Sequence, residues 1–181
     1  MEYLDVVDEN GVPTGKIVTR QEAHKEGYLH HTAHVWIVRH RHGIVQILLQ
    51  KRCKDKDSFP ECFDISSAGH IPAGEDYIPS AIRELKEELG LNVEPGELRD
   101  CGLHRYDIDD VFHGEPFKDR QISRVFLLWR DMDESEFALQ KEEIESVLWI
   151  DFVACLDMVR NHTIPNCIDI TELEMLASHL E

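Results

Sequence analysis

The stretch "GHIPAGEDYIPSAIRELKEELGL", residues 69–91, joins a glycine-containing turn to the clearest helical pattern in the chain. Apolar side chains recur along it at helical spacing, at Ile78, Ala81, Ile82, Leu85 and Leu89. Asp76 is a suitable N-cap, and Pro79 falls in the first turn, where a missing N–H costs little. Because Gly90 readily adopts the backbone conformation that ends a helix, we expect one amphipathic helix between Asp76 and Gly90.

Three glutamates, Glu84, Glu87 and Glu88, lie off this apolar stripe at positions i, i+3 and i+4. Side chains at that spacing share one helix face, so their like charges repel. Taken alone, such a charge run is more typical of a solvated surface than of a site. The alternative is a divalent cation site, because Mg²⁺ prefers carboxylate oxygens as ligands.

The complete pattern favours the cation site. It reads as a glycine, five residues, a glutamate, seven residues, Arg-Glu-Leu, one residue, Glu-Glu, one residue, and Gly-Leu. This pattern resembles the complete Nudix box, the signature of the Nudix superfamily. The resemblance implies an α+β fold, the Nudix α/β/α sandwich, in which a mixed β-sheet lies between helices. The segments "YLDVVD" and "GKIVT" flank the turn-forming "ENGVPTG" and predict an N-terminal β-hairpin as an extension.

The resemblance also implies roles for residues of the box. The implied metal ligands are the Gly69 backbone carbonyl, Glu84, Glu87 and Glu88. Glu84 serves as ligand or general base in different members of the family, so Glu84 and Glu87 are expected catalytic residues together with Arg83. Arg83 would orient a glutamate by ion pairing, and Glu75 would hold the loop to the helix.

The implied reaction is the cleavage of a diphosphate linkage by metal-assisted attack of water. The expected cofactor is Mg²⁺ or Mn²⁺, which would polarise the phosphoryl oxygen and lower the pKa of the attacking water. The expected substrate is a nucleoside diphosphate derivative or a related organic diphosphate. The chain is therefore expected to be a metal-dependent hydrolase acting on acid anhydrides.

The charge of the chain agrees with a metal-bound substrate. Its 181 residues include 19 Lys plus Arg and 36 Asp plus Glu, a formal net charge of −17. Such a chain repels polyanions, so nucleic acid and anionic membranes are disfavoured partners. A small anionic substrate remains compatible, because metal ions can neutralise the site locally. A homodimer is only a family-level expectation.

The cysteines and the chain start favour a cytoplasmic protein. Five cysteines are widely spaced without a C-x-x-C motif, which argues against a disulfide framework. The acidic start "MEYLDVVDEN" lacks the features of a secretory signal.

We expect one domain over residues 1–181, with the hairpin at about 1–20, the box at 69–91 and C-terminal helices at about 152–181. Two later strands, "LRDCGLHRY" and "QISRVFLLWR", are expected to flank a polar loop, "DIDDVFHGEPFKD".

Outside the box, the chain resembles the type I isopentenyl-diphosphate isomerases, a branch of the same superfamily. In the segment "AHKEGYLHHTAH", His24 and His31 match two histidines that bind the metal of the isomerase, and His70 matches a third. A second metal site at these three histidines is one interpretation. A packing or hydrogen-bonding role is the other, because a histidine needs partners to act as a ligand.

The catalytic positions of the isomerase are altered. Ala68 stands where the isomerase has its catalytic cysteine, and a methyl group cannot transfer a proton. Asp119 and Gln121 are the best match to a pair of glutamates on a later strand. We therefore expect an isomerase-like Nudix hydrolase, with isomerase activity as the disfavoured alternative.

Two further groups of residues are candidates for the site. Arg52 ends an expected strand that leads toward the box, and a guanidinium suits phosphate binding; Arg39 and Lys51 are weaker candidates. The acidic segment "QKEEIE" offers Glu142, Glu143 and Glu145 as a second acid–base carboxylate. For each group, an ordinary charged surface is the alternative.

Overall fold

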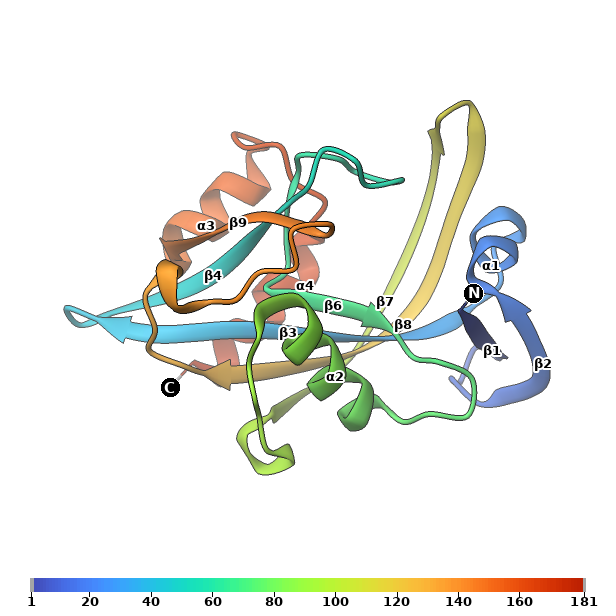
Figure 1. The fold of residues 1–181 in the computed structure, drawn as a ribbon, viewed down its shortest axis with the longest axis horizontal. Coiled ribbons are helices and arrows are strands. Elements are labelled where there is room, and N and C mark those ends of the chain that lie inside the picture. Colours follow the sequence, from blue (N-terminus) through green and yellow to red (C-terminus); the bar gives the residue numbers. More distant parts are fainter. Residues whose placement is uncertain (1, 181) are drawn as a thin grey trace.

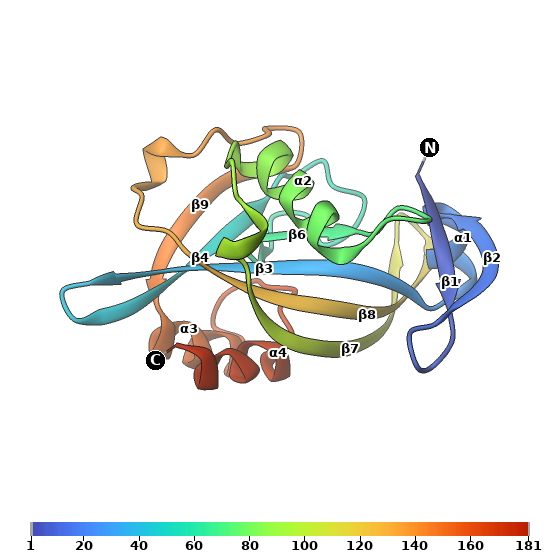
Figure 2. The same ribbon diagram turned by 90° about the horizontal axis from the view of Figure 1, so that it is seen from below.

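A computed structural model describes residues 2–180 as a mixed β-sheet between helices. The strands of the seven-stranded sheet are β3 (His30–Arg41), β4 (Ile44–Arg52), β5 (Phe63–Asp64), β6 (Ser67–His70), β7 (Arg99–Phe112), β8 (Glu115–Trp129) and β9 (Ile144–Asp151). β3 runs parallel to β8, and its pairs with β4 and β6 are antiparallel. The helix α2 (Tyr77–Leu89) covers one face, and α3 (Phe152–Arg160) and α4 (Ile170–Met175) cover the other (Figure 2). The expected sandwich with a mixed sheet is confirmed.

The helix of the box begins and ends as the sequence predicts. The Asp76 side chain accepts a hydrogen bond from the Tyr77 backbone N–H, and Gly90 ends α2 with φ of +71°. Its apolar stripe packs on β3, where Leu85 and Leu89 are fully buried beside Val35. Each such leucine stabilises the fold by roughly 1.5–3 kcal/mol relative to an exposed side chain.

An antiparallel hairpin precedes the sheet. It consists of β1 (Tyr3–Val7) and β2 (Pro13–Thr19), followed by the short helix α1 (Arg20–Glu26) (Figure 1). An isolated bridge between Leu4 and Pro72 ties the hairpin to the loop that leads into α2. The hairpin and α1 therefore lie at the end of the sheet where β6 delivers the start of the box.

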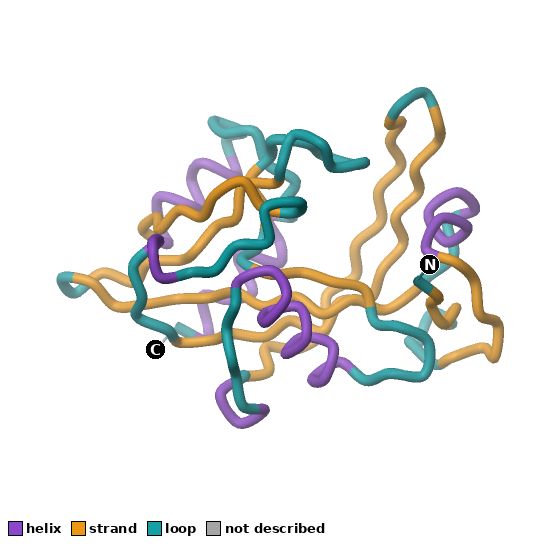
Figure 3. Tube along the Cα trace, in the orientation of Figure 1, coloured by secondary structure: helices purple, strands orange, loops and turns teal. Residues whose placement is uncertain are grey.

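The prediction of a polar loop between β7 and β8 is wrong. Both strands continue through that segment to a tight turn at His113 and Gly114, so that they form a long hairpin arm that extends beyond the sheet (Figures 1 and 3). The φ angles of the turn residues are 52° and 80°, which suits the twist of a two-residue hairpin. The segment is polar because much of the arm is solvent-exposed, and exposure does not prevent strand pairing.

The sheet opens between β3 and β4, and this opening positions the site. β4 pairs with β3 only near the distant turn, at the partners Val38 and Ile47 through Arg41 and Ile44. Nearer the box, β3 pairs with β6 instead, and β4 pairs with β5 and β9.

None of the helices within residues 2–180 has the length and apolar character of a membrane-spanning helix.

Candidate active site

The box begins with a close approach between β6 and α2. A Cβ atom built on Gly69 would lie 2.3 Å from the carboxyl carbon of Glu84. A Cβ at this position would force the Glu84 side chain to move, so glycine permits the close approach. The packing brings the Glu84 carboxylate against the Gly69 backbone, and both line the same cavity.

Glu88 is the most deeply placed carboxylate of the box. Its side chain accepts a hydrogen bond of 2.6 Å from Ser67 Oγ, and the residue is only 7% exposed. Burial raises the pKa of Glu88 to about 8, and burial also raises the pKa of Glu84. Three carboxylates thus share one end of the cavity, since Glu87 lines it from the exposed side of α2.

Two contacts hold the acidic face in place. Arg83 Nη1 lies 2.8 Å from Glu84 Oε1 and 3.3 Å from Glu87 Oε2, so Arg83 bridges two of the glutamates. Ser80 Oγ donates a hydrogen bond to Glu75, which ties the loop before α2 to the helix.

These oxygen donors fit a hard divalent cation. Carboxylates and a backbone carbonyl are the ligands that Mg²⁺ and Mn²⁺ accept. Burial disfavours the negative charges of Glu84 and Glu88, and a nearby cation would offset that cost.

A cavity of about 300 Å³ extends from this acidic end. It passes between α2, the segment after β4, the β7–β8 arm and α4, through the opening in the sheet. Three cationic side chains line it: Arg20, Arg52 and Lys56. A metal-binding end beside cationic groups, in a volume at the lower end of ligand pockets, can hold a small phosphorylated molecule.

The NUDIX domain family model matches residues 29–164, which include the whole box. The chain belongs to the Nudix family. It is one of the Nudix hydrolases, which act on pyrophosphate bonds and generally use divalent metals. An uncharacterised Nudix hydrolase of Clostridium acetobutylicum is 36% identical over 150 residues, which are 83% of this chain and 70% of that protein.

Other relatives agree with this assignment. Nudix hydrolase 3 of Arabidopsis thaliana is 36% identical over 153 residues, which are 83% of this chain but only 19% of that much longer protein. The crystal structure of DR0079 from Deinococcus radiodurans superposes with a TM-score of 0.72 at 18% identity, covering 95% of this chain and 96% of that one. That structural likeness supports the fold alone.

The sequence predicts only some of the cationic residues that line the cavity of this Nudix protein. Arg52 lines the cavity, where its Nη1 contacts Asp64 at 2.9 Å and its Nη2 donates to the Ser58 carbonyl. Arg20 and Lys56 were missed, because the first stands on α1 and the second in an irregular segment. Only the tertiary structure brings these two to the box.

The weaker phosphate-binding candidates lie outside the cavity lining. Arg39 stacks over the Trp149 ring, with 4.2 Å between the guanidinium carbon and the ring centre. Lys51 pairs with Glu145 away from the cavity. Of the candidates Glu142, Glu143 and Glu145, Glu143 lines the cavity, where it forms an ion pair with Lys56, and the other two do not line it.

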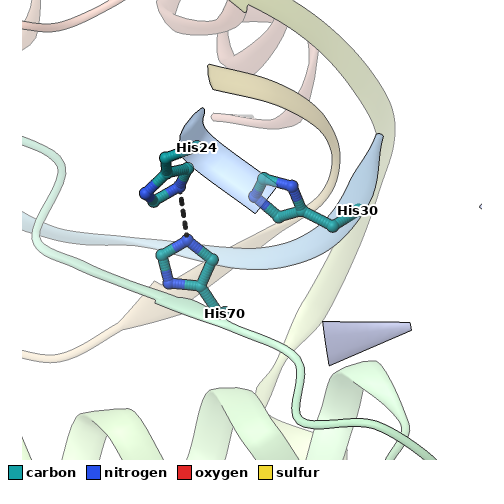
Figure 4. A group of neighbouring side chains, drawn as sticks. All are labelled: His24, His30 and His70. Atoms are coloured by element: carbon teal, nitrogen blue, oxygen red, sulfur yellow. Dashed lines mark hydrogen bonds between the residues drawn. The ribbon is translucent and has the colours of Figure 1, made fainter. Parts of the chain in front are cut away.

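A histidine cluster lies beside the box in this Nudix protein. His24 of α1, His30 of β3 and His70 of β6 each offer a ring nitrogen, and these nitrogens lie within 4.8 Å of one another (Figure 4). Asp119 Oδ1 is 3.7 Å from His24 Nε2 and 3.6 Å from His30 Nε2, and it has no hydrogen-bond partner within residues 2–180. Three imidazoles and a carboxylate form a donor set suited to a divalent transition metal.

The structure corrects one member of the predicted histidine group. His30, and not His31, meets His24 and His70. Neighbouring strand residues point to opposite faces, so the His31 ring packs on Tyr77 instead, with 4.9 Å between the ring centres. The strand pattern around residues 30–38 could have revealed this, because His30 shares the parity of His34 and Trp36.

Burial keeps the clustered imidazoles uncharged near neutral pH. It lowers the pKa of His24 to about 3 and that of His30 to about 4. Burial also raises the pKa of the neighbouring Asp119 carboxyl to about 6. A neutral imidazole is the form that binds metal, so the cluster fits a second metal ion.

Proposed function

We propose that this Nudix protein hydrolyses a diphosphate linkage in a nucleoside diphosphate derivative or a related small organic diphosphate. The observation that carries the proposal is the meeting of Gly69, Glu84, Glu87 and Glu88 at one end of a cavity that cationic side chains also line. The proposed ligands of Mg²⁺ or Mn²⁺ are the Gly69 carbonyl and the three carboxylates. Such a cation polarises a phosphoryl oxygen and makes water more acidic when it is bound.

The residues of the chain have separate proposed tasks around the diphosphate. Arg52 and Lys56 bind phosphate oxygens; Arg52 Nη1 carries a second N–H beside the one that Asp64 accepts. Glu84 accepts the proton of the attacking water, and Arg83 holds its carboxylate in position at 2.8 Å. Glu143 is the alternative general base, because it is the carboxylate of the segment "QKEEIE" that lines the cavity.

A second divalent cation is proposed at His24, His30, His70 and Asp119. The support is the convergence of four donors on one small volume that adjoins the same cavity. These donors lie near Arg20, so the cation would lie at one side of the bound diphosphate, where it would add positive charge.

Isopentenyl-diphosphate isomerase activity is the alternative function. It would require side chains that donate and accept a proton, but the cavity has Ala68 in place of the isomerase's cysteine and Gln121 in place of one of its glutamates. Neither side chain can give and take a proton near neutral pH. The measurement is solvent deuterium uptake into isopentenyl diphosphate with metal present, and we expect none.

The hydrolase proposal is tested with a substrate panel. Nucleoside diphosphate derivatives and other organic diphosphates are incubated with Mg²⁺ or Mn²⁺, and phosphorus NMR locates the broken bond. We expect Glu87→Gln to lower kcat/KM by at least about 100-fold, since even residues supporting a ligand are worth 10–100-fold. Glu97→Gln is the matched control, because Glu97 is exposed and pairs with Arg130 outside the cavity. Equal turnover by wild type and Glu87→Gln would overturn the proposal.

A further inference from the structure

One wall of the cavity is made by residues 53–62, which join β4 to β5 and are called the β4–β5 segment below. Lys56, Ser58 and Phe59 of this segment line the cavity, and Phe117 lines it from the β7–β8 arm. The segment, teal in Figure 1, reaches toward the arm. Two elements that are far apart in the chain therefore complete this wall together.

Three phenylalanine rings join the segment to the arm. The centre of the Phe59 ring lies 4.8 Å from that of Phe112 and 6.4 Å from that of Phe117, and the two arm rings are 5.3 Å apart. The interplanar angles are 70°, 85° and 80°, the edge-to-face arrangement that aromatic pairs favour. Each ring is half-buried although the neighbouring Pro60 and Val111 are exposed, so the rings cover one another.

The arm is the anchored partner in this contact. Phe117 packs on the ring of His24 in α1, with 4.6 Å between the ring centres. A Cβ on Gly27, which ends α1, would lie 3.3 Å from the Lys118 side chain, so α1 closely supports the arm. The strands β7 and β8 also remain paired as far as the turn. Movement between the two elements is therefore expected in the β4–β5 segment.

Side chains hold most of the β4–β5 segment in place. Within residues 2–180, no backbone hydrogen bond joins residues 54–61 to another element. Phe59 and Glu61 have φ angles of 46° and 61°, in the left-handed region that residues with a Cβ rarely occupy. Such strained conformations persist only where surrounding contacts hold them, and they cluster at ligand clamps and switch regions. The aromatic contact therefore opposes relaxation of the segment.

The segment is also linked to the cationic groups proposed to bind phosphate. Arg52 Nη2 donates a hydrogen bond of 3.0 Å to the Ser58 carbonyl, and Arg52 Nε donates one of 3.2 Å to the Phe59 carbonyl. Lys56 belongs to the segment and pairs with Glu143. A phosphate bound by Arg52 and Lys56 would interact best with one position of the segment, so binding and closure would favour each other.

We propose that the β4–β5 segment is a gate to the cavity, held closed by the contact of Phe59 with Phe112 and Phe117. Ligands enter and leave when Phe59 separates from the arm, and the gate closes again over a bound phosphorylated molecule, which shields it from water. Phe112 isolates this role, because it contacts Phe59 but lies outside the cavity lining. The inference rests on the proposed function only for the identity of the molecule that enters.

Thiol access tests the gate without any ligand. Cys167 lines the cavity, whereas Cys155 of α3 is fully buried. The full chain is treated with N-ethylmaleimide, and peptide mass spectrometry follows each cysteine. Phe112→Ala is expected to speed the labelling of Cys167 about 5- to 20-fold, the effect of losing two aromatic contacts, without changing that of Cys155.

Two control variants accompany this measurement. Phe112→Tyr keeps the ring, and Val111→Ala changes an exposed neighbour on the same arm, so both are expected to label like the wild type. Equal labelling of Cys167 in wild type and Phe112→Ala would overturn the gate. Faster labelling of Cys167 and Cys155 together would also overturn it, because general loosening of the fold would then explain the access.

Binding rates distinguish a gate from a simple ligand contact. The probe is the non-hydrolysable α,β-methylene analogue of ADP with Mg²⁺, and surface plasmon resonance on the immobilised full chain gives both rate constants. Phe112→Ala is expected to raise kon and koff alike, about 5- to 20-fold, with Kd changed less than about 3-fold, because the gate is closed in the free and the bound protein. A raised koff with an unchanged kon would overturn the gate.

Turnover separates this inference from the proposed function. If Phe112→Ala opens the cavity to maleimide but the wild type cleaves no diphosphate, the hydrolase proposal fails and the gate stands. If the wild type cleaves diphosphates but Phe112→Ala labels like the wild type, the hydrolase proposal stands and the gate is wrong. If the ADP analogue does not bind, the labelling of Cys167 decides the inference alone.

Discussion

The Gly69 backbone and the Glu84 carboxylate are packed so closely that a Cβ on residue 69 would come within 2.3 Å of the carboxyl carbon. This contact links the end of β6 to the middle of α2. It explains in steric terms why the box opens with glycine, fifteen positions before the glutamate that it contacts. The geometry of the acidic end therefore depends on the absence of a Cβ atom at residue 69 as much as on the carboxylates.

Gly69→Ala is expected to displace Glu84 and to lower metal-dependent hydrolysis by at least about 10-fold, the lower range for disturbed support of a metal ligand. Hydrolysis and Mg²⁺ affinity are both measured. Gly96→Ala is the control, because a Cβ there would meet nothing within 4 Å. If the two variants behave alike with Mg²⁺, the steric account of Gly69 is wrong.

Ser67→Ala removes the hydrogen bond that holds Glu88, whose donor and acceptor are 2.6 Å apart. Ser67 is a positioning residue, so the expected effect is a 10- to 100-fold weaker metal affinity with a smaller change in kcat at saturating metal. Metal titration of activity distinguishes the two quantities. Ser178→Ala, at an exposed serine near the C-terminus, should leave both unchanged. A loss of kcat that excess metal does not restore would contradict this role.

The histidine cluster predicts different effects of substitutions at His30 and His31, which are adjacent in the chain. His30→Gln should remove one of two bound Co²⁺ or Mn²⁺ ions per chain, because His30 faces His24 and His70. His31→Gln should retain both ions, because its ring packs against Tyr77 on the other face. Elemental analysis after dialysis counts the ions, and the absorption spectrum of the Co²⁺ form reports imidazole ligation. Identical stoichiometry in the two variants would rule out the second site.

Glu172 forms a buried ion pair with His34, and both residues line the cavity. Burial opposes both charges, yet mutual attraction lowers the pKa of the Glu172 carboxyl and raises that of the His34 imidazole. Glu172→Gln leaves the imidazole without its counter-charge, and we expect it to lower the free energy of unfolding by about 3–5 kcal/mol. Urea denaturation measures this loss, with the exposed Glu174→Gln as control.

The pH dependence of that loss follows from the two shifts. The lowered pKa of Glu172 adds stability above its unfolded value of 4.5, and this stability is lost as the pH falls. The raised pKa of His34 adds stability that is complete below its unfolded value of 6.5 and is lost as the pH rises through the folded value. The difference between wild type and Glu172→Gln should therefore be greatest between pH 4.5 and 6.5. A difference that keeps growing above pH 8 would contradict the ion pair.

The amino-acid sequence alone determined the local features of this protein. The helix from Tyr77 to Leu89, its two caps and the spacing of the glutamates depend on residues within one or two helical turns of one another. Such interactions are encoded by neighbours in the chain, so a single sequence is enough to predict them. The Nudix assignment followed from the same 23-residue window.

Only the tertiary structure decided which distant residues meet that window. Strand parity selects His30 over His31, and strand pairing extends the β7–β8 arm through a segment that is polar because it is exposed. The opening between β3 and β4 brings Lys56, Tyr106 and Gln121 into one cavity. These choices depend on strand register and on packing between elements far apart in the chain. The physical reason is that a shift of one residue in strand register moves each side chain of the strand to the opposite face of the sheet.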